Sequence, residues 1–392
     1  MLDLKFVLKN KKTVIKELSE RKMEVCDFSK LSAMEDKRKE IMQQVDYLRK
    51  QKKILSEQFE NIVNAKQKID ENIHKKLKDI NVQLRNEEGN LNLCKEEINS
   101  FLNFLPNLAH SSVPQGFPGK PNTLISKNVK KTKFNFQPKT YLELAEKLKI
   151  IDFPNSYPIF NLDIVFYKNL GAKIYRAIID FLLDRHSHGG CHELSPSVLA
   201  DGYPVLKLLR GAILNEDELP LSYCSHSFCF RKDWNYAEDI KNLKRIKQFD
   251  SVEVMKLVKS KDSYLFLENL REDVESILQD LDLPYEVYLF NKGNLDYIAS
   301  KAYSIKVFLP GLNNFLEIAV CSNLSDFFTK DLNIRIKNEK EKNLEYAHVL
   351  HAKSLIINRV MMAILENYQQ SDGSVIIPRV LKPYLNNLGV IN

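Results

Sequence analysis

Two stretches in the N-terminal part of the chain carry apolar residues at alternating steps of four and three, the spacing of a coiled-coil seam. No proline occurs before Pro106, so a long helix can run through each stretch. The polar segment 61–68 between them favours a turn. We therefore predict an antiparallel helical hairpin that buries one seam against the other. The seam positions are Ile41, Val45, Leu48, Lys52, Leu55, Phe59 and Ile62 in the first stretch, and Leu77, Ile80, Leu84, Glu87, Leu91, Cys94, Ile98, Phe101 and Leu105 in the second.

The pattern changes after a segment rich in proline and glycine. Short strand-like runs such as 251–258 and 305–309 then alternate unevenly with helical stretches such as 174–184 and 262–281. This mixture predicts an α+β fold with a mostly antiparallel sheet, and the absence of a glycine-rich phosphate loop argues against a dinucleotide fold or P-loop. We expect a helical arm over residues 1–110, a basic Pro/Gly linker over 111–133, and a core over 134–392.

Composition narrows the class of protein. The 392 residues are 44% apolar and 28% charged, which is typical of a globular chain. No apolar run approaches the roughly 20 residues of a membrane helix. The N-terminus lacks the features of a signal or transit peptide, and the six cysteines are scattered, so we expect a cytoplasmic protein in a reducing compartment. Lys and Arg exceed Asp and Glu by seven, which allows a polyanionic partner without requiring one.

The predicted arm carries many lysines and arginines at its polar positions. From the pattern alone, the favoured interpretation is that charged flanks keep a coiled coil in solution. The alternative is contact with phosphates, because a long arm can lie along a nucleic acid and read its shape.

Local strings near both ends of the chain resemble bacterial-type seryl-tRNA synthetases, which are class II aminoacyl-tRNA synthetases. The resemblance covers nearly the whole chain, arm included, and the block 363–378 is close to the C-terminal signature of that family. The strings are Met1-Leu2-Asp3-Leu4-Lys5-Phe6, Leu105-Pro106-Asn107-Leu108, Cys229-Phe230-Arg231, Arg245-Ile246-Lys247-Gln248-Phe249-Asp250, Phe315-Leu316-Glu317-Ile318 and Ala363 to Pro378.

The resemblance implies a class II core, an antiparallel sheet flanked by helices, and an arm that lies across tRNA. It implies tRNA rather than DNA as the partner, no membrane, and either a homodimer or a heterodimer with an intact synthetase. ATP and Mg²⁺ are the implied cofactors if nucleotide binding persists. The arm residues expected to contact tRNA are Arg49, Lys50, Lys53, Lys75 and Lys76.

The resemblance also assigns site residues. Arg231 corresponds to the arginine that bridges the α-phosphate and the amino-acid carboxylate, and Arg359 to the arginine over the nucleotide; these two would be the catalytic residues. Asp233 stands where the family has glutamate. The remaining positions that the resemblance assigns to nucleotide binding are Arg245 and Phe249, the latter matching the ring on which adenine stacks. Glu253 matches a carboxylate near the serine side chain, and Glu317 matches a metal-binding carboxylate.

Several positions depart from the family pattern. The Thr-x-Glu that holds the substrate ammonium falls on Ala200 and Gly202, and some tens of residues before it are absent. The segment 234–238, normally small and glycine-rich, contains a tryptophan and a tyrosine. The string 351–354, Asn-Gly-Ser/Thr-Gly in the family, reads His-Ala-Lys-Ser, and Val320 replaces a serine that helps to bind the metal.

These observations favour a synthetase-like protein that binds tRNA, with ATP as a candidate ligand and with serine activation weak or lost. The alternative is a divergent but working serine–tRNA ligase. Aminoacyl transfer to a carrier protein is known for relatives without the arm, so the arm argues against it. A pure coiled-coil scaffold leaves Arg231, Phe249, Glu317 and Arg359 unexplained.

Overall fold

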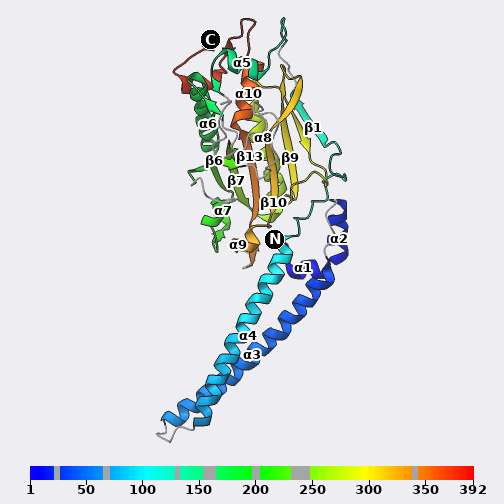
Figure 1. The fold of residues 1–392 in the computed structure, drawn as a ribbon, viewed down its shortest axis with the longest axis vertical. Coiled ribbons are helices and arrows are strands. Elements are labelled where there is room, and N and C mark those ends of the chain that lie inside the picture. The colour runs from blue at the N-terminus through cyan, green and yellow to red at the C-terminus, as the bar shows by residue number, and fades with distance from the viewer. Residues whose placement is uncertain are drawn as a thin grey trace. The chain divides into compact units, whose positions relative to one another are not determined.

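The computed structural model describes residues 1–21, 27–64, 71–128, 133–152, 165–196, 204–230, 248–337 and 343–392 (Figure 1). The chain divides into two compact units. The first comprises Met1–Ser19 and Met23–Pro106, and the second comprises Glu20–Lys22 and Asn107–Asn392. None of the helices in these described ranges is both long and apolar enough to cross a lipid bilayer.

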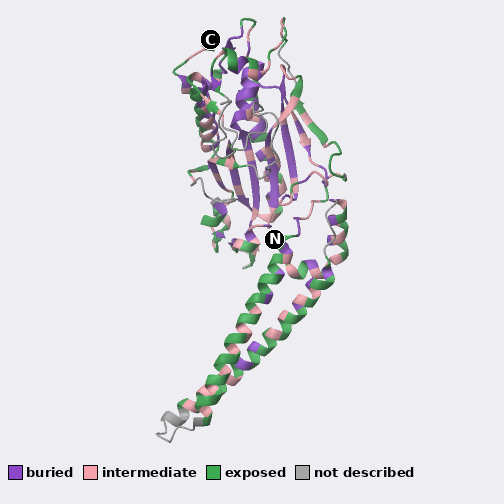
Figure 2. Cartoon of the chain, viewed as in Figure 1, coloured by how far each residue is buried: buried purple, intermediate pink, exposed green. Residues whose placement is uncertain are grey.

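The first unit is a helical hairpin. Cys94 donates to the backbone oxygen of Met34 at 3.3 Å, and Arg49 pairs with Glu88 at 2.8 Å, so the two long helices run antiparallel. Every predicted seam residue whose side chain is described is buried or half-buried, the polar Lys52 included, while most positions between them are exposed (Figure 2). The predicted hairpin is confirmed. Of the segment 61–68 predicted as its turn, residues 61–64 belong to α3, and 65–68 lie outside the described residues. Its helices are α1 (Leu4–Lys9), α2 (Lys11–Glu20), α3 (Phe28–Asn64) and α4 (Glu71–Asn103).

The second unit is built on an eight-stranded sheet with the order β1-β8-β9-β10-β13-β7-β6-β4. All neighbouring strands pair antiparallel except β4 and β6, which pair parallel. This confirms the predicted α+β class with a mostly antiparallel sheet. The strands are β1 (Thr123–Asn128), β4 (His192–Leu194), β6 (Leu221–Phe230), β7 (Gln248–Val258), β8 (Tyr285–Leu289), β9 (Lys301–Leu309), β10 (Asn314–Ser325) and β13 (His348–Ile356).

Three helices pack on one face of this sheet: α6 (Leu170–His188), α8 (Ser263–Asp280) and α10 (Ile357–Asn367). Val254 of β7 and Ile305 of β9 share a buried core with residues of all three helices. Successive side chains of a strand point to opposite faces, so Glu253, next to Val254, points away from these helices. The helix-covered face supplies the hydrophobic core, and the opposite face is where a polar site can form.

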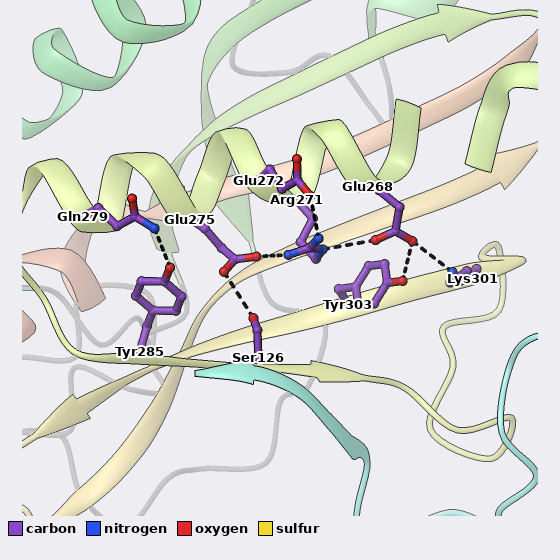
Figure 3. Close-up of polar contacts among 9 residues, drawn as sticks. All are labelled: Ser126, Glu268, Arg271, Glu272, Glu275, Gln279, Tyr285, Lys301 and Tyr303. Atoms are coloured by element: carbon purple, nitrogen blue, oxygen red, sulfur yellow. Dashed lines mark hydrogen bonds and ion pairs between the residues drawn. The ribbon is translucent and has the colours of Figure 1, made fainter. Parts of the chain in front are cut away.

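A polar network fastens α8 to the sheet (Figure 3). Arg271 forms ion pairs with Glu268 and Glu275 on its own helix. Glu268 also accepts hydrogen bonds from Lys301 at 3.0 Å and from the Tyr303 hydroxyl, both on β9. Because the Arg271 side chain is only 12% exposed, this network holds a largely buried charge in place.

Smaller elements complete the second unit. A second buried core beneath the sheet includes Leu257 of β7 and Val349 of β13 together with Ile336, Ile334 and Leu206. These elements are α5 (Tyr141–Lys147), α7 (Pro204–Leu208) and α9 (Thr329–Leu332), a three-stranded sheet of β12 (Leu344–Tyr346), β11 (Arg335–Lys337) and β5 (Ile213–Asn215), and two strand pairs, β2 (Ile151–Asp152) with β3 (Phe166–Tyr167) and β14 (Val375–Ile376) with β15 (Val390–Ile391).

The segment 111–133, predicted as a linker, contributes a strand to the sheet, since β1 pairs with β8. Just before β1, the Asn291 side chain donates to the backbone oxygen of Lys120 at 2.9 Å. A Cβ added to Gly116 would lie 2.5 Å from Asn291 Cγ, so this glycine permits close packing. A short edge strand beside prolines and glycines has no strong hydrophobic alternation, which is why the pattern did not predict it. The division into three functional parts stays a prediction.

Candidate active site

A row of directly paired residues crosses the sheet on the face opposite the three helices. From β6 to β9 it contains Ser225, Glu253, Lys353, Val320 and Ser304, each opposite the next across a strand pair. Directly opposed residues of antiparallel strands point to the same face, so the row forms one surface. It brings together a carboxylate, an ammonium group and two hydroxyls.

Glu253 is held by protein groups on both of its oxygens. Oε2 lies 3.6 Å from Nε2 of His351. Oε1 accepts hydrogen bonds from the Ser251 hydroxyl at 3.3 Å and the Cys229 thiol at 3.7 Å. Burial alone would raise the pKa of Glu253, but the hydrogen bond and charge of His351, with the charge of Lys353, outweigh it and lower the pKa to about 2. Glu253 is therefore an ionised carboxylate already engaged by its neighbours.

Phe249 lies on the same face of β7 as Glu253, four residues away. This residue is 8% exposed. The ammonium nitrogen of Lys353 lies 5.7 Å from the centroid of the Phe249 ring, within the distance at which a cation is attracted to an aromatic face. Lys353 thus lies beside both residues that the resemblance assigns to substrates on β7, as the cross-strand partner of Glu253 and as a cation near the Phe249 ring.

Glu317 and Arg359 are in contact near the Ser304 end of the row. Glu317 lies on β10 opposite Lys306, and its Oε2 accepts a hydrogen bond from the Ser304 hydroxyl at 2.6 Å. Arg359, in the first turn of α10, donates from Nη1 to the backbone oxygen of Glu317. The structure therefore brings these two predicted residues together.

Near Glu317, the only carboxylate named in this part of the site is that of Glu317 itself, so binding of Mg²⁺ there would depend on this one side chain. Mg²⁺ in nucleotide sites is bound by one or two carboxylates together with phosphates and water. Glu317 would supply one such ligand, whereas the neighbouring Val320 has no donor atom. Within the described ranges, no group of three His, Cys, Asp or Glu side chains is arranged to hold a metal ion. Metal binding at Glu317 stays a prediction.

The other predicted site residues lie outside the described residues. These are Arg231, Asp233 and Arg245, together with Ala200, Gly202 and the segment 234–238. The strands that flank Arg231 and Arg245 are described: β6 ends at Phe230 and β7 begins at Gln248, directly opposite one another. The roles predicted for these residues stay predictions.

The sequence patterns do not assign His351, Lys353, Ser251 or Ser304 to the site. The only signal for the first two was the departure of residues 351–354 from the family string. The Ser251 hydroxyl reaches Glu253 because the two residues lie two apart on one face of β7, whereas the Ser304 hydroxyl reaches Glu317 through the pairing of β9 with β10, which the sequence does not display.

The basic residues predicted to contact tRNA lie on the surface of the hairpin. The Arg49 and Lys53 side chains are 59% and 79% exposed, and Lys50, Lys75 and Lys76 are exposed as well. Next to them, α3 and α4 enclose a shallow hollow of about 560 Å³. It is lined by Phe59, His74, Leu77, Lys78, Asn81, Val82 and Arg85.

Comparison with known proteins fits this geometry. Residues 201–368 match the tRNA synthetase class II core domain (G, H, P, S and T), and residues 1–109 match the seryl-tRNA synthetase N-terminal domain. The second unit has a mostly antiparallel sheet with helices on one face and a polar row on the other, and it matches the class II core domain. These features define a class II aminoacyl-tRNA synthetase fold.

The full-length relatives identify the family. The serine–tRNA ligase of Thermodesulfovibrio yellowstonii is 34% identical across 98% of this chain and 99% of its own length. That of Bacillus subtilis is 33% identical across 100% of both. The seryl-tRNA synthetase of Pyrococcus horikoshii, solved in complex with ATP, has a TM-score of 0.85 at 25% identity over 100% of this chain and 99% of that one. The chain belongs to the seryl-tRNA synthetase family.

Proposed function

We propose that this chain is a tRNA-binding member of the seryl-tRNA synthetase family in which serine activation is weak or lost. The observation that carries this proposal is the state of Glu253. The carboxylate assigned to the serine side chain accepts hydrogen bonds from Ser251 and Cys229 and faces His351. A serine hydroxyl has to compete with these protein donors for the same oxygens.

The sequence departures act in the same direction. Ala200 and Gly202 offer no side-chain acceptor to the substrate ammonium, and Val320 offers no metal ligand. A hydrogen bond to a charged group contributes about 2 kcal/mol, and each such loss in the transition state slows the reaction about thirtyfold. The two losses at the ammonium together lower activation of serine about a thousandfold, and the missing metal ligand at Val320 acts in the same direction.

Serine-dependent exchange of pyrophosphate into ATP tests this part of the proposal. We expect exchange within background for the full chain, measured beside the Bacillus subtilis enzyme as a positive control. Exchange well above background that disappears in Arg231→Ala shows that the site is catalytic and refutes the proposed loss.

The second candidate is a working serine–tRNA ligase. It is favoured by the similarity to proteins named serine–tRNA ligase over the whole chain, and by the retention of Phe249, Glu317 and Arg359 around one face of the sheet. Under this candidate, the exchange reaction and the charging of tRNA with serine both proceed, with ATP bound and Mg²⁺ at Glu317.

The tRNA part of the proposal rests on the arm. Its exposed basic residues lie along a hairpin that matches the N-terminal domain of the family. Contacts with phosphates release counterions, so binding weakens as salt rises, with a log–log slope of about 0.7–0.9 per contact. A dimer, with a second copy or with an intact synthetase, and a cytoplasmic location are part of the same proposal.

Binding of tRNA is best measured over a series of salt concentrations with two matched double variants. Lys50→Gln with Lys53→Gln removes two charges from the arm, whereas Lys173→Gln with Lys261→Gln removes two exposed charges from the second unit. We expect the first pair to reduce the salt slope by about 1.5 and the second pair to leave it unchanged. Equal slopes for the wild type and the arm variant contradict the role of the arm.

A further inference from the structure

Lys353 occupies a central position in the site row. It lies directly opposite Glu253 of β7 on one side and Val320 of β10 on the other. Its ammonium nitrogen stands 5.7 Å from the centroid of the Phe249 ring, and Phe249 is the residue that the resemblance assigns to stacking on adenine. Sequence comparison with the family string places serine or threonine at this position, and neither side chain is long enough to cover the ring.

We propose that Lys353 caps the nucleotide site from within: its ammonium group covers the face of Phe249 on which a purine base would stack. The inference rests on the proposed function: weak binding of the adenine base would be one cause of weak serine activation. Lys353 is thus a specificity-determining residue that disfavours the adenine base of ATP.

The charge of the Glu253 carboxylate favours this position of the Lys353 ammonium group. Lys353 is the cross-strand partner of Glu253, and its positive charge helps to keep that carboxylate ionised. A purine that stacks on Phe249 must displace the ammonium group from the ring and weaken its interaction with Glu253. The attraction of the ammonium group to the ring is lost on displacement, and this loss offsets part of the gain from stacking the base.

The cap affects the base and not the phosphates, which gives a sharp test. Binding of ATP and of inorganic tripolyphosphate to the full chain is compared by isothermal titration calorimetry. We expect the wild type to bind the two ligands about equally, because the base gains no stacking. In Lys353→Ser the ring is uncovered, and we expect ATP to bind about tenfold more tightly than in the wild type, which corresponds to about 1.4 kcal/mol.

Two further variants control for charge and for fold. Lys353→Arg keeps a cation over the ring, and we expect it to bind ATP as the wild type does. Lys256→Ser removes a positive charge from the helix-covered face of β7, the strand that carries Phe249. Lys256 pairs there with Asp273 at 3.1 Å, and we expect no change in ATP affinity. Circular dichroism of each variant checks that the chain is folded.

Each contrary result overturns the cap. Weaker ATP binding in Lys353→Ser than in the wild type identifies Lys353 as a phosphate contact. ATP binding that equals that of the wild type, or that is undetectable, shows that Lys353 does not limit access of the base to the Phe249 ring. A wild type that already prefers ATP over tripolyphosphate by tenfold also refutes the proposal. The exchange assay separates these outcomes from the proposed function, since it measures serine activation and not base stacking.

Discussion

Glu366 is a fully buried carboxylate in the block 363–378, and the structure assigns it a structural task. Its Oε1 accepts a hydrogen bond from the backbone N–H of Tyr141 at 2.9 Å. Its Oε2 accepts from the N–H groups of Gly311 and Leu312 at 2.8 and 3.2 Å. The first of these donors opens α5, where a helix has no backbone acceptor of its own for the N–H group. One side chain of α10 thereby ties down two distant segments.

The cost of removing this carboxylate follows from the three donors. A buried N–H group without an acceptor costs about 1–3 kcal/mol. Glu366→Ala leaves three of them and a small cavity, so we expect a loss of about 4–6 kcal/mol in the free energy of unfolding. Glu366→Gln keeps one acceptor oxygen and turns an NH₂ group toward the remaining donors, so we expect a smaller loss of about 2–3 kcal/mol.

Differential scanning calorimetry of the full chain measures both variants. For a unit of this size 1 kcal/mol shifts Tm by about 2–4 °C, so Glu366→Ala should lower the transition of the second unit by about 10 °C or more. Glu146→Ala, the same substitution at an exposed position of α5, is the matched control and should shift Tm by less than about 2 °C. A loss below 1 kcal/mol for Glu366→Ala refutes the reasoning, because the three donors would then have other acceptors.

Two further predictions concern charges on the helix-covered face. Nε2 of His186 lies 2.7 Å from the Ser354 hydroxyl, and burial lowers the pKa of His186 from 6.5 to about 4. Between these two values the unfolded chain binds a proton more readily than the folded chain does. The free energy of unfolding is therefore unaffected above pH 6.5 and falls by about 3 kcal/mol as the pH drops to 4. Urea midpoints measured from pH 7.5 to 4.5 should show this decline in the wild type and a flatter profile in His186→Gln, and parallel profiles contradict the assignment. Arg271→Met leaves the carboxylates of Glu268 and Glu275 without their shared cation, so the urea midpoint should indicate a loss of about 3 kcal/mol. The control Glu272→Gln, at a side chain that is 65% exposed, should cost less than about 0.5 kcal/mol, and a similar loss in both variants counts against the network.

The hairpin was predictable because its information is local. Seam positions recur along a single helix, and each helix needs only one partner with the same period. Even the polar seam members Lys52 and Glu87 are half-buried, as their positions in the period require. The edge strand β1 was not predictable, because its pairing with β8 depends on residues more than 150 positions away in the chain.

The residues of the candidate site likewise fall into those that the sequence pattern identified and those that it did not. Phe249 and Glu317 were found in the sequence because each stands in a string that resembles the family, and Glu253 and Arg359 because they match family positions close to such strings. Their neighbours were not: Lys353 reaches Phe249, and His351 reaches Glu253, only because β13 pairs with β7 in one register. A shift of that register by one residue would turn both side chains to the helix-covered face.

The sequence by itself determined the helical arm, the mixed core and the family, since these depend on hydrophobic period and on strings of adjacent residues. Only the tertiary structure decided which groups surround the residues that are predicted to bind substrates. Strand pairing places an ammonium group over an aromatic ring and brings a thiol and an imidazole to the oxygens of a carboxylate, and such contacts depend on distances in space that no spacing along the chain encodes.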